Sequence, residues 1–229
     1  MAHAEATNEL HTFLDKHPVK EFGKGEIIIF QGEAPRVAYV VRQGIVKSYN
    51  LSIDGNEKPV AFYSADAVFP SPWVYGKTPS SIYYYEAFTD LVKLAAVPRE
   101  EFVRFIKSSP QLLYMELDHY LNEQLGNSIR LNALQHSRAS EKLLYTLHYL
   151  AISHGETVAP QKKKILLDLT HQDFANLTGL TRETAATELN KLKHAGVINY
   201  GKGQLYTLDL AKLMNVLNDQ YIADLDIKF

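Results

Sequence analysis

The 229-residue chain contains no cysteine. Composition therefore excludes disulfide bonds, thiolate nucleophiles, and cysteine-ligated zinc or iron–sulfur sites. Histidine is also missing between His17 and His119, which removes the commonest metal ligand from most of the N-terminal half. Neither a Ser-His-Asp arrangement nor a nucleotide-cradling motif occurs elsewhere. We therefore expect no cofactor, no metal site and no enzymatic activity.

Long apolar runs and a leader-like N-terminus are lacking as well. The opening MAHAEATNELHTFLDKHP has no basic segment followed by an apolar one, and no apolar run approaches the roughly 18 residues of a membrane span. We therefore expect a cytoplasmic protein. Charge is almost balanced, with 24 Lys and Arg against 26 Asp and Glu, so whole-chain charge neither requires nor excludes nucleic acid.

From about Val19 to Val97 the sequence is typical of strands and turns. Short β-rich runs such as EIIIF, VAYVV, IVKSYNL and PVAFY follow one another, with glycine-containing turn signals between them. These signals recur about every ten residues, at Gly25, Gly32, Gly44 and Asp54-Gly55. The pattern predicts a small antiparallel barrel or sandwich.

Between Gln111 and Arg138 the hydrophobic period becomes helical. Leucines recur four residues apart up to Ile129, which predicts a long amphipathic helix. A stripe of this length at the centre of the chain predicts contact with both the barrel and a second copy of the protein, and a plain core helix is the alternative. The predicted dimer interface comprises Leu113, Leu117, Leu121, Leu125 and Ser128.

The segment after this helix is predicted to contain a second helix and a strand. ASEKLLYTLHYLAISHG is expected to be helical and to end at His154-Gly155, where glycine is a usual stop. The basic run from Lys162 to Lys164 is interpreted as a solvated turn, with an approach to the DNA backbone as the alternative. The following ILLDL is predicted to be a strand.

Two short helices are predicted in the stretch THQDFANLTGLTRETAATELNKLKHAGVI. Thr170 can cap the first helix with Asp173 three residues later, and Gly179 can end it. Thr181 is then a second N-cap, and an apolar stripe of Ala185, Leu189 and Leu192 points inward. Two helices joined by a tight glycine-containing turn form a helix-turn-helix.

The outward face of the second helix has the chemistry of base recognition in a DNA major groove. Arg182 can donate twice to guanine, and Glu183 can accept from N4 of cytosine. VINYGKGQLYTL is interpreted as a two-stranded wing with Lys202 at its tip. A winged helix used for protein contact is the alternative. The predicted DNA contacts are Thr170, Gln172, Thr181, Arg182, Glu183, Thr184, Thr187, Asn190 and Lys202.

Taken together, these motifs resemble the CRP/FNR family of bacterial transcription regulators over nearly the whole chain. LTGLTRETAATELNKLKHAGVI is similar to the family's helix-turn-helix signature, and the glycine rhythm from Gly25 to Gly55 is similar to its cyclic-nucleotide-binding-type β-roll. The resemblance implies an α+β fold with an antiparallel β-roll (double-stranded β-helix) in residues 1–110, a dimerisation helix in 111–138 and a winged helix-turn-helix in 139–229.

Function also follows from the resemblance. It implies a homodimer that binds double-stranded DNA at an inverted repeat, with RNA polymerase as an expected partner. By matching position, Arg182 and Glu183 would read bases and Thr184 would contact a phosphate. The family often has a second arginine where this chain has Thr187. Because threonine cannot make the bidentate contact of arginine to guanine, we expect a different target sequence.

The segment FPSPWVYGKTPSSIYYYEAF departs from the family's cyclic AMP cassette. Lys77 is the only charged residue between Asp66 and Glu86, so the glutamate for the ribose and the arginine for the phosphate are both missing. Control by cyclic AMP is therefore not expected. Activation or repression, and the target genes, do not follow from the sequence.

Aromatic residues are concentrated in the same segment. They predict either a pocket for an unidentified small-molecule effector or a core that the rings fill, with Tyr83 and Tyr85 on one face of a strand and Tyr84 on the other. The candidate effector pocket comprises Phe69, Trp73, Tyr75, Tyr83, Tyr85, Asn127 and Ser128. The alternative function is a sensor or interaction protein that binds a small molecule in the β-roll without binding DNA.

Overall fold

The computed structural model describes residues 2–201 and 205–217, with residues 2 and 3 described by backbone alone. The chain forms two compact units, residues 1–120 and 121–229. Helix α4 (Pro110–Gln135) crosses the division between them. The segment boundaries expected after residues 110 and 138 lie near the two ends of this helix, and they stay a prediction.

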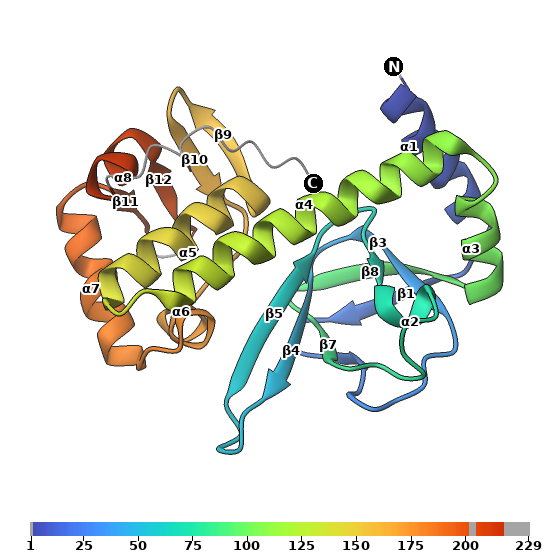
Figure 1. Cartoon of the computed structure of the whole chain (residues 1–229), viewed down its shortest axis with the longest axis horizontal. Coiled ribbons are helices and arrows are strands. Elements are labelled where there is room, and N and C mark those ends of the chain that lie inside the picture. Colours follow the sequence, from blue (N-terminus) through green and yellow to red (C-terminus); the bar gives the residue numbers. More distant parts are fainter. Residues whose placement is uncertain (1, 202–204, 218–229) are drawn as a thin grey trace. The chain divides into compact units, whose positions relative to one another are not determined.

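The first unit contains the predicted antiparallel β-roll, drawn in blue to green in Figure 1. One sheet has the order β1-β8-β3-β6 and the other β2-β7-β4-β5. The strands are β1 (Val19–Gly23), β2 (Ile27–Ile29), β3 (Ala38–Gln43), β4 (Val46–Leu51), β5 (Glu57–Tyr63), β6 (Val68–Phe69), β7 (Tyr84–Ala87) and β8 (Leu91–Val97). Its helices before α4 are α1 (Ala2–Leu14), α2 (Ser71–Val74) and α3 (Arg99–Ile106).

The central strands β3 and β8 of the sheet β1-β8-β3-β6 are buried on both faces, whereas the edge strand β1 is largely exposed. In β3, Ala38 and Val40 pack into a cluster with α1, α3 and the start of α4, which we call the helix-side cluster. Tyr39 and Val41 point the other way into the inner cluster between the sheets. The inner cluster comprises Ile29, Tyr39, Val41, Val46, Ala61, Tyr63, Phe69, Tyr85, Ala87, Val92, Leu94 and Ala96.

One predicted turn glycine is fixed by close packing. Gly44, between β3 and β4, has a φ of 81°. A Cβ atom at this position would lie 2.3 Å from the carbonyl oxygen of Leu91, so the chain passes β8 too closely for any side chain. Here the turn needs glycine for both its conformation and its size.

Helix α4 has 26 residues and presents different faces along its length. Leu112 and Met115 are buried in the helix-side cluster. The leucines of the predicted dimer stripe are exposed instead, at 46% for Leu113, 50% for Leu117, 55% for Leu121 and 37% for Leu125. Ile129, expected on the same stripe, is buried.

The second unit forms around α5 (Ala139–His154), which is buried over most of its length. The other elements are β9 (Gly155–Ala159), β10 (Lys162–Ile165), α6 (His171–Thr178), α7 (Arg182–His194), β11 (Ile198–Asn199), β12 (Thr207–Asp209) and α8 (Leu210–Leu217). Its four strands pair in the order β11-β12-β10-β9 (Figure 1). Gly126 of α4 approaches α5 so closely that a Cβ atom would lie 2.8 Å from the Tyr149 ring.

Two expectations for this unit were wrong. Lys162–Lys164 is a strand rather than a solvated turn, because its backbone pairs with β9 on one side and β12 on the other. The strand expected at ILLDL ends at its first residue, Ile165. Leu167 and Leu169 are buried at 0% exposure, but by side-chain packing and without a strand. Helix α5 does end at His154, although Gly155 is extended and begins β9.

No helix in the described ranges is both long enough and apolar enough to cross a membrane.

Candidate DNA-binding site

The turn between α6 and α7 is fixed by short-range hydrogen bonds. At the start of α6, the Asp173 N–H donates to Thr170 Oγ1 at 3.1 Å, and Asp173 Oδ2 accepts from the Thr170 N–H at 2.8 Å. The predicted capping box is therefore present, and the Thr170 hydroxyl is also engaged with Asp173 Oδ2. Gly179 ends the helix with a φ of 68° in the left-handed region.

Helix α7 has the predicted buried and exposed faces. Thr181 caps it by accepting a hydrogen bond from the Thr184 N–H at 3.2 Å. Ala185 and Leu189 are buried at 0% exposure, whereas Arg182 and Glu183 are exposed in the first turn. In the part of the chain that the structure describes, neither of these two charged side chains makes a hydrogen bond or an ion pair.

Three other predicted contacts differ in their surroundings. Thr187 is exposed on the outward face of α7. Gln172 is exposed on α6, where its Nε2 donates to Asn176 Oδ1 at 2.9 Å. Lys202 lies outside the described residues. The role of each in binding DNA stays a prediction.

Asn190 has a partner that the sequence analysis missed. The hydroxyl of Tyr200, which follows β11, donates to Asn190 Oδ1 at 3.0 Å. Lys193 Nζ fixes this tyrosine by donating to its carbonyl oxygen at 2.9 Å and lying 4.1 Å from the ring centroid. The bond fixes one acceptor site of the Asn190 amide oxygen, and the side chain of Asn190 is exposed. The only sequence signal was an aromatic residue beside the wing.

His171 was also missed, and it lies within electrostatic reach of Arg182 at the start of α7. It is the first residue of α6, and its ring packs edge-on against Tyr200 with the centroids 6.1 Å apart. Burial and then the positive charge of Arg182 lower the pKa of His171. The neutral imidazole is thus favoured near Arg182.

The residues of the candidate effector pocket are divided between separate places. Phe69 and Tyr85 stack at 4.9 Å in the inner cluster, and Tyr83 packs against that cluster. Trp73 and Tyr75 belong to the helix-side cluster instead. As the strand alternation predicts, Tyr84 lies on the opposite face from Tyr85.

The two helix-side residues have their own partners. The Arg99 guanidinium lies 5.2 Å from the Trp73 ring centroid. Tyr75 donates its hydroxyl to Glu116 of α4 at 2.6 Å, and burial raises the pKa of both groups. In the second unit, Asn127 is half-buried, and the exposed Ser128 donates to the Gln124 carbonyl at 2.9 Å. A ligand-binding role for this set stays a prediction.

In the described ranges, no group of three His, Cys, Asp or Glu side chains is arranged so that it could hold a metal ion.

Comparison with known families matches both halves of the chain. Residues 19–109 match the cyclic nucleotide-binding domain, and residues 141–216 match the Crp-like helix-turn-helix domain. The chain belongs to the CRP/FNR family of transcription regulators. It is thus a DNA-binding transcription regulator of this type, which confirms the expectation that it is not an enzyme.

Individual relatives agree with this membership. The chain is 28% identical to the global nitrogen regulator of Synechocystis sp. over 188 residues, which are 82% of this chain and 83% of the relative. It is also 28% identical to the transcriptional regulator SdrP of Thermus thermophilus, over 84% of this chain and 90% of that protein. The fold of FixK2 from Bradyrhizobium japonicum superposes with a TM-score of 0.71 at 21% identity, over 87% of this chain and 96% of that one.

Proposed function

We propose that this CRP/FNR-family protein acts in the cytoplasm as a homodimer that binds an inverted-repeat DNA site. The observation that carries the proposal is the exposed first turn of α7, where Arg182 and Glu183 have no bonding partner within the described residues. The preceding cap and glycine turn hold that surface rigidly relative to α6. A rigid helix N-terminus that presents unpaired Arg and Glu is suited to a major groove.

Each predicted contact has a distinct task in this proposal. Arg182 donates to guanine O6 and N7, and Glu183 accepts from cytosine N4. Thr184 contacts a phosphate, and Asn190 contacts the DNA with a side chain that the Tyr200 hydroxyl holds in place. The family often has arginine where this chain has Thr187. Threonine cannot make the bidentate contact of arginine to guanine, so the DNA target differs in sequence from that of relatives with the arginine. Thr170, Gln172, Thr181 and Lys202 border these contacts.

The proposed dimer forms through the exposed stripe on α4. Leu113, Leu117, Leu121 and Leu125 recur one helical turn apart, and Ser128 continues the line. Leucines this exposed in a row are covered when two helices pair, which removes apolar surface from water. Two recognition helices related by a two-fold axis would then reach half-sites about 34 Å apart. In this arrangement the predicted boundaries after residues 110 and 138 separate the dimerisation helix from the β-roll before it and from the winged helix-turn-helix after it.

Control by cyclic AMP is not part of the proposal. The cassette after β6 offers Lys77 as its only charged side chain between Asp66 and Glu86, so a cyclic phosphate and a ribose would lack their partners. Another small-molecule effector remains a hypothesis, and RNA polymerase is a proposed partner. A sensor that binds a small molecule without DNA is the alternative function.

The test is a selection of genomic DNA fragments by the purified full-length chain at a fixed salt concentration. The retained fragments are sequenced and aligned, and the same selection is run with an Arg182→Ala, Glu183→Ala double variant. An inverted repeat enriched by the wild type and lost in the variant supports the proposal. Enrichment that is unchanged in the variant contradicts the assigned reading face, and no enrichment with or without cell metabolites favours the alternative.

A further inference from the structure

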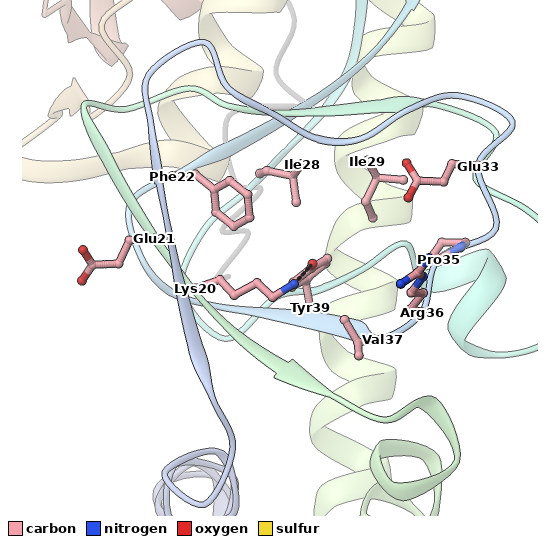
Figure 2. Close-up of a pocket in the computed structure, with 10 residues that line it drawn as sticks. All are labelled: Lys20, Glu21, Phe22, Ile28, Ile29, Glu33, Pro35, Arg36, Val37 and Tyr39. Atoms are coloured by element: carbon pink, nitrogen blue, oxygen red, sulfur yellow. Dashed lines mark hydrogen bonds between the residues drawn. The ribbon is translucent and has the colours of Figure 1, made fainter.

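A groove lies at the open edge of the two β-roll sheets (Figure 2). Strand β1 ends one sheet and β2 ends the other, and the described strands show no pairing between them. Between these edges and the segment that leads to β3, the groove has a volume of about 710 Å³. It is lined by Lys20, Glu21, Phe22, Ile28, Ile29, Glu33, Pro35, Arg36, Val37 and Tyr39.

The walls of this groove are apolar. Phe22, Ile28 and Val37 are half-buried and pack against the inner cluster, while Ile29 and Tyr39 belong to that cluster. Half-buried apolar side chains in a concavity offer contact area to the apolar body of a ligand. The volume falls in the range of about 300 to 1,000 Å³ that small-molecule sites occupy.

One cation of the groove points inward from a strand. Lys20 pairs in register with Leu94, a member of the inner cluster, so it shares the inner face of the sheet. Its Nζ donates to Tyr39 Oη, the dashed line in Figure 2, at a distance of 3.2 Å. The same Nζ lies 5.6 Å from the Tyr39 ring centroid. Within the described residues it has no carboxylate partner. The second cation, Arg36, is exposed and has neither a hydrogen bond nor an ion pair in that same part of the chain.

The two acids at the groove are already engaged. Glu21 pairs with Lys93 at 2.8 Å, and Glu33 Oε2 accepts a hydrogen bond from the Phe30 N–H at 3.0 Å. Glu33 has no cationic partner within the described residues, and Lys20 and Arg36 are the two cations of the lining, neither of which pairs with a carboxylate in that part of the chain.

We propose that this groove binds a small organic anion with an apolar body, of the chemical class of medium-chain carboxylates. The carboxylate contacts Lys20 and Arg36, and the apolar chain covers Phe22, Ile28 and Val37. Two cations that line one apolar groove complement such an amphipathic anion better than a neutral or cationic molecule. The site lies entirely in the first unit and is distinct from the aromatic cassette after β6.

The test uses decanoate as the probe, with decanamide as a neutral molecule of matched length. Each is titrated into the full-length chain by calorimetry, and isoleucine methyl NMR signals are followed in parallel because Ile28 and Ile29 line the groove. We expect decanoate, and not decanamide, to bind and to shift those two methyl signals. The measurement contains no DNA, so its outcome is independent of the proposed DNA-binding function.

Two variants locate the charged group of the ligand. Lys20→Met keeps an apolar stem while removing the ammonium, and Arg36→Gln removes the guanidinium. Loss of either charge-assisted contact should weaken decanoate binding by about tenfold or more. Lys77→Gln, an exposed lysine outside the groove, is the control and should leave binding unchanged. Thermal unfolding verifies that each variant is folded.

Three results would overturn the proposal. Equal binding of decanamide and decanoate refutes the role of charge. Unchanged decanoate affinity in both groove variants refutes the position of the site. No binding of decanoate to the wild type refutes the ligand class, and Lys20 then serves as an inward charge that protects the edge of a sheet from unwanted pairing.

Discussion

Phe69 of the β-roll and Arg182 of α7 represent two extremes of burial in one chain. Phe69 is fully buried and makes ring contacts with Tyr39, Tyr63 and Tyr85 from three different strands. Arg182 is exposed, and its side chain makes no hydrogen bond or ion pair within the described residues. The aromatic residues of the inner cluster therefore find their partners within the chain, whereas we propose that the surface of α7 finds its partners on DNA. Substitutions in the two regions should accordingly change different observables.

The largest effect on DNA binding is expected from the α4 stripe. Leu121→Glu combined with Leu125→Glu places charges on a surface that we propose to be paired in the dimer, where burying them is costly. Sedimentation should show monomers, and loss of two-site binding should lower DNA affinity by roughly 100-fold or more. The control is Leu134→Glu, an exposed leucine about two and a half turns beyond Leu125 and therefore on the opposite face of the same helix. A dimer that persists in the double variant would refute this interface.

Phe69→Ala should produce the largest loss of stability and leave base reading intact. Removing a fully buried ring from the inner cluster leaves a cavity and should lower the free energy of unfolding by about 3 to 5 kcal/mol. Denaturant unfolding measures this loss, and the folded fraction should retain the same DNA sequence preference. Leu51→Ala, at a strand position that is 47% exposed, is the control and should change stability by about 0.5 kcal/mol or less. A changed DNA preference in Phe69→Ala would contradict the separation of the two regions.

Arg182→Ala should show the reverse pattern. Loss of the bidentate contact to guanine should weaken specific DNA binding by about 1 to 3 kcal/mol and relax the preference at one base of each half-site. Unfolding should change little because the side chain is exposed. Titration of the selected site and of a single-base mismatch, at one salt concentration, separates reading of that base from general attraction to phosphates. Equal weakening on both DNAs would assign Arg182 to the backbone.

The smallest predicted effect concerns a single hydroxyl. Tyr200→Phe removes the donor to Asn190 Oδ1 but keeps the ring beneath Lys193, so DNA affinity should fall by about 1 kcal/mol or less with the overall fold unchanged. Tyr206→Phe is the matched control, because the Tyr206 hydroxyl is buried without a hydrogen-bond partner in the described structure. Removing that hydroxyl should leave stability equal or higher. Equal DNA binding by both variants and the wild type would show that Tyr200 does not position Asn190.

Local signals account for what the sequence predicted best. The caps at Thr170 and Thr181 and the left-handed Gly179 depend on residues at most four positions away, so the helix-turn-helix could be derived from short motifs. The family resemblance supplied the order of the β-roll, the long helix and the second unit. The exposed face of α7 followed because its buried stripe repeats at helical spacing.

Long-range pairing accounts for what the sequence did not predict. Lys163 lies in a strand because it pairs with Thr157 and Leu208, although its own side chain favours a solvated turn. Tyr200 contacts Asn190 from ten positions away, across the end of α7. Phe69 and Trp73 are only four residues apart, yet they enter different clusters on opposite sides of a sheet. Composition and period do not encode such distant partners.

The burial of β3 on both of its faces has a mechanical consequence. Along β3, neighbouring residues such as Val40 and Val41 face opposite clusters, so one layer of backbone separates two close-packed interiors. A strand that is free on one side can move outward when a side chain on the other side grows. β3 has no such free side. A larger residue at Ala38 would therefore push the backbone of β3 toward the aromatic rings of the inner cluster. A change in packing in the helix-side cluster would in this way displace side chains between the two sheets.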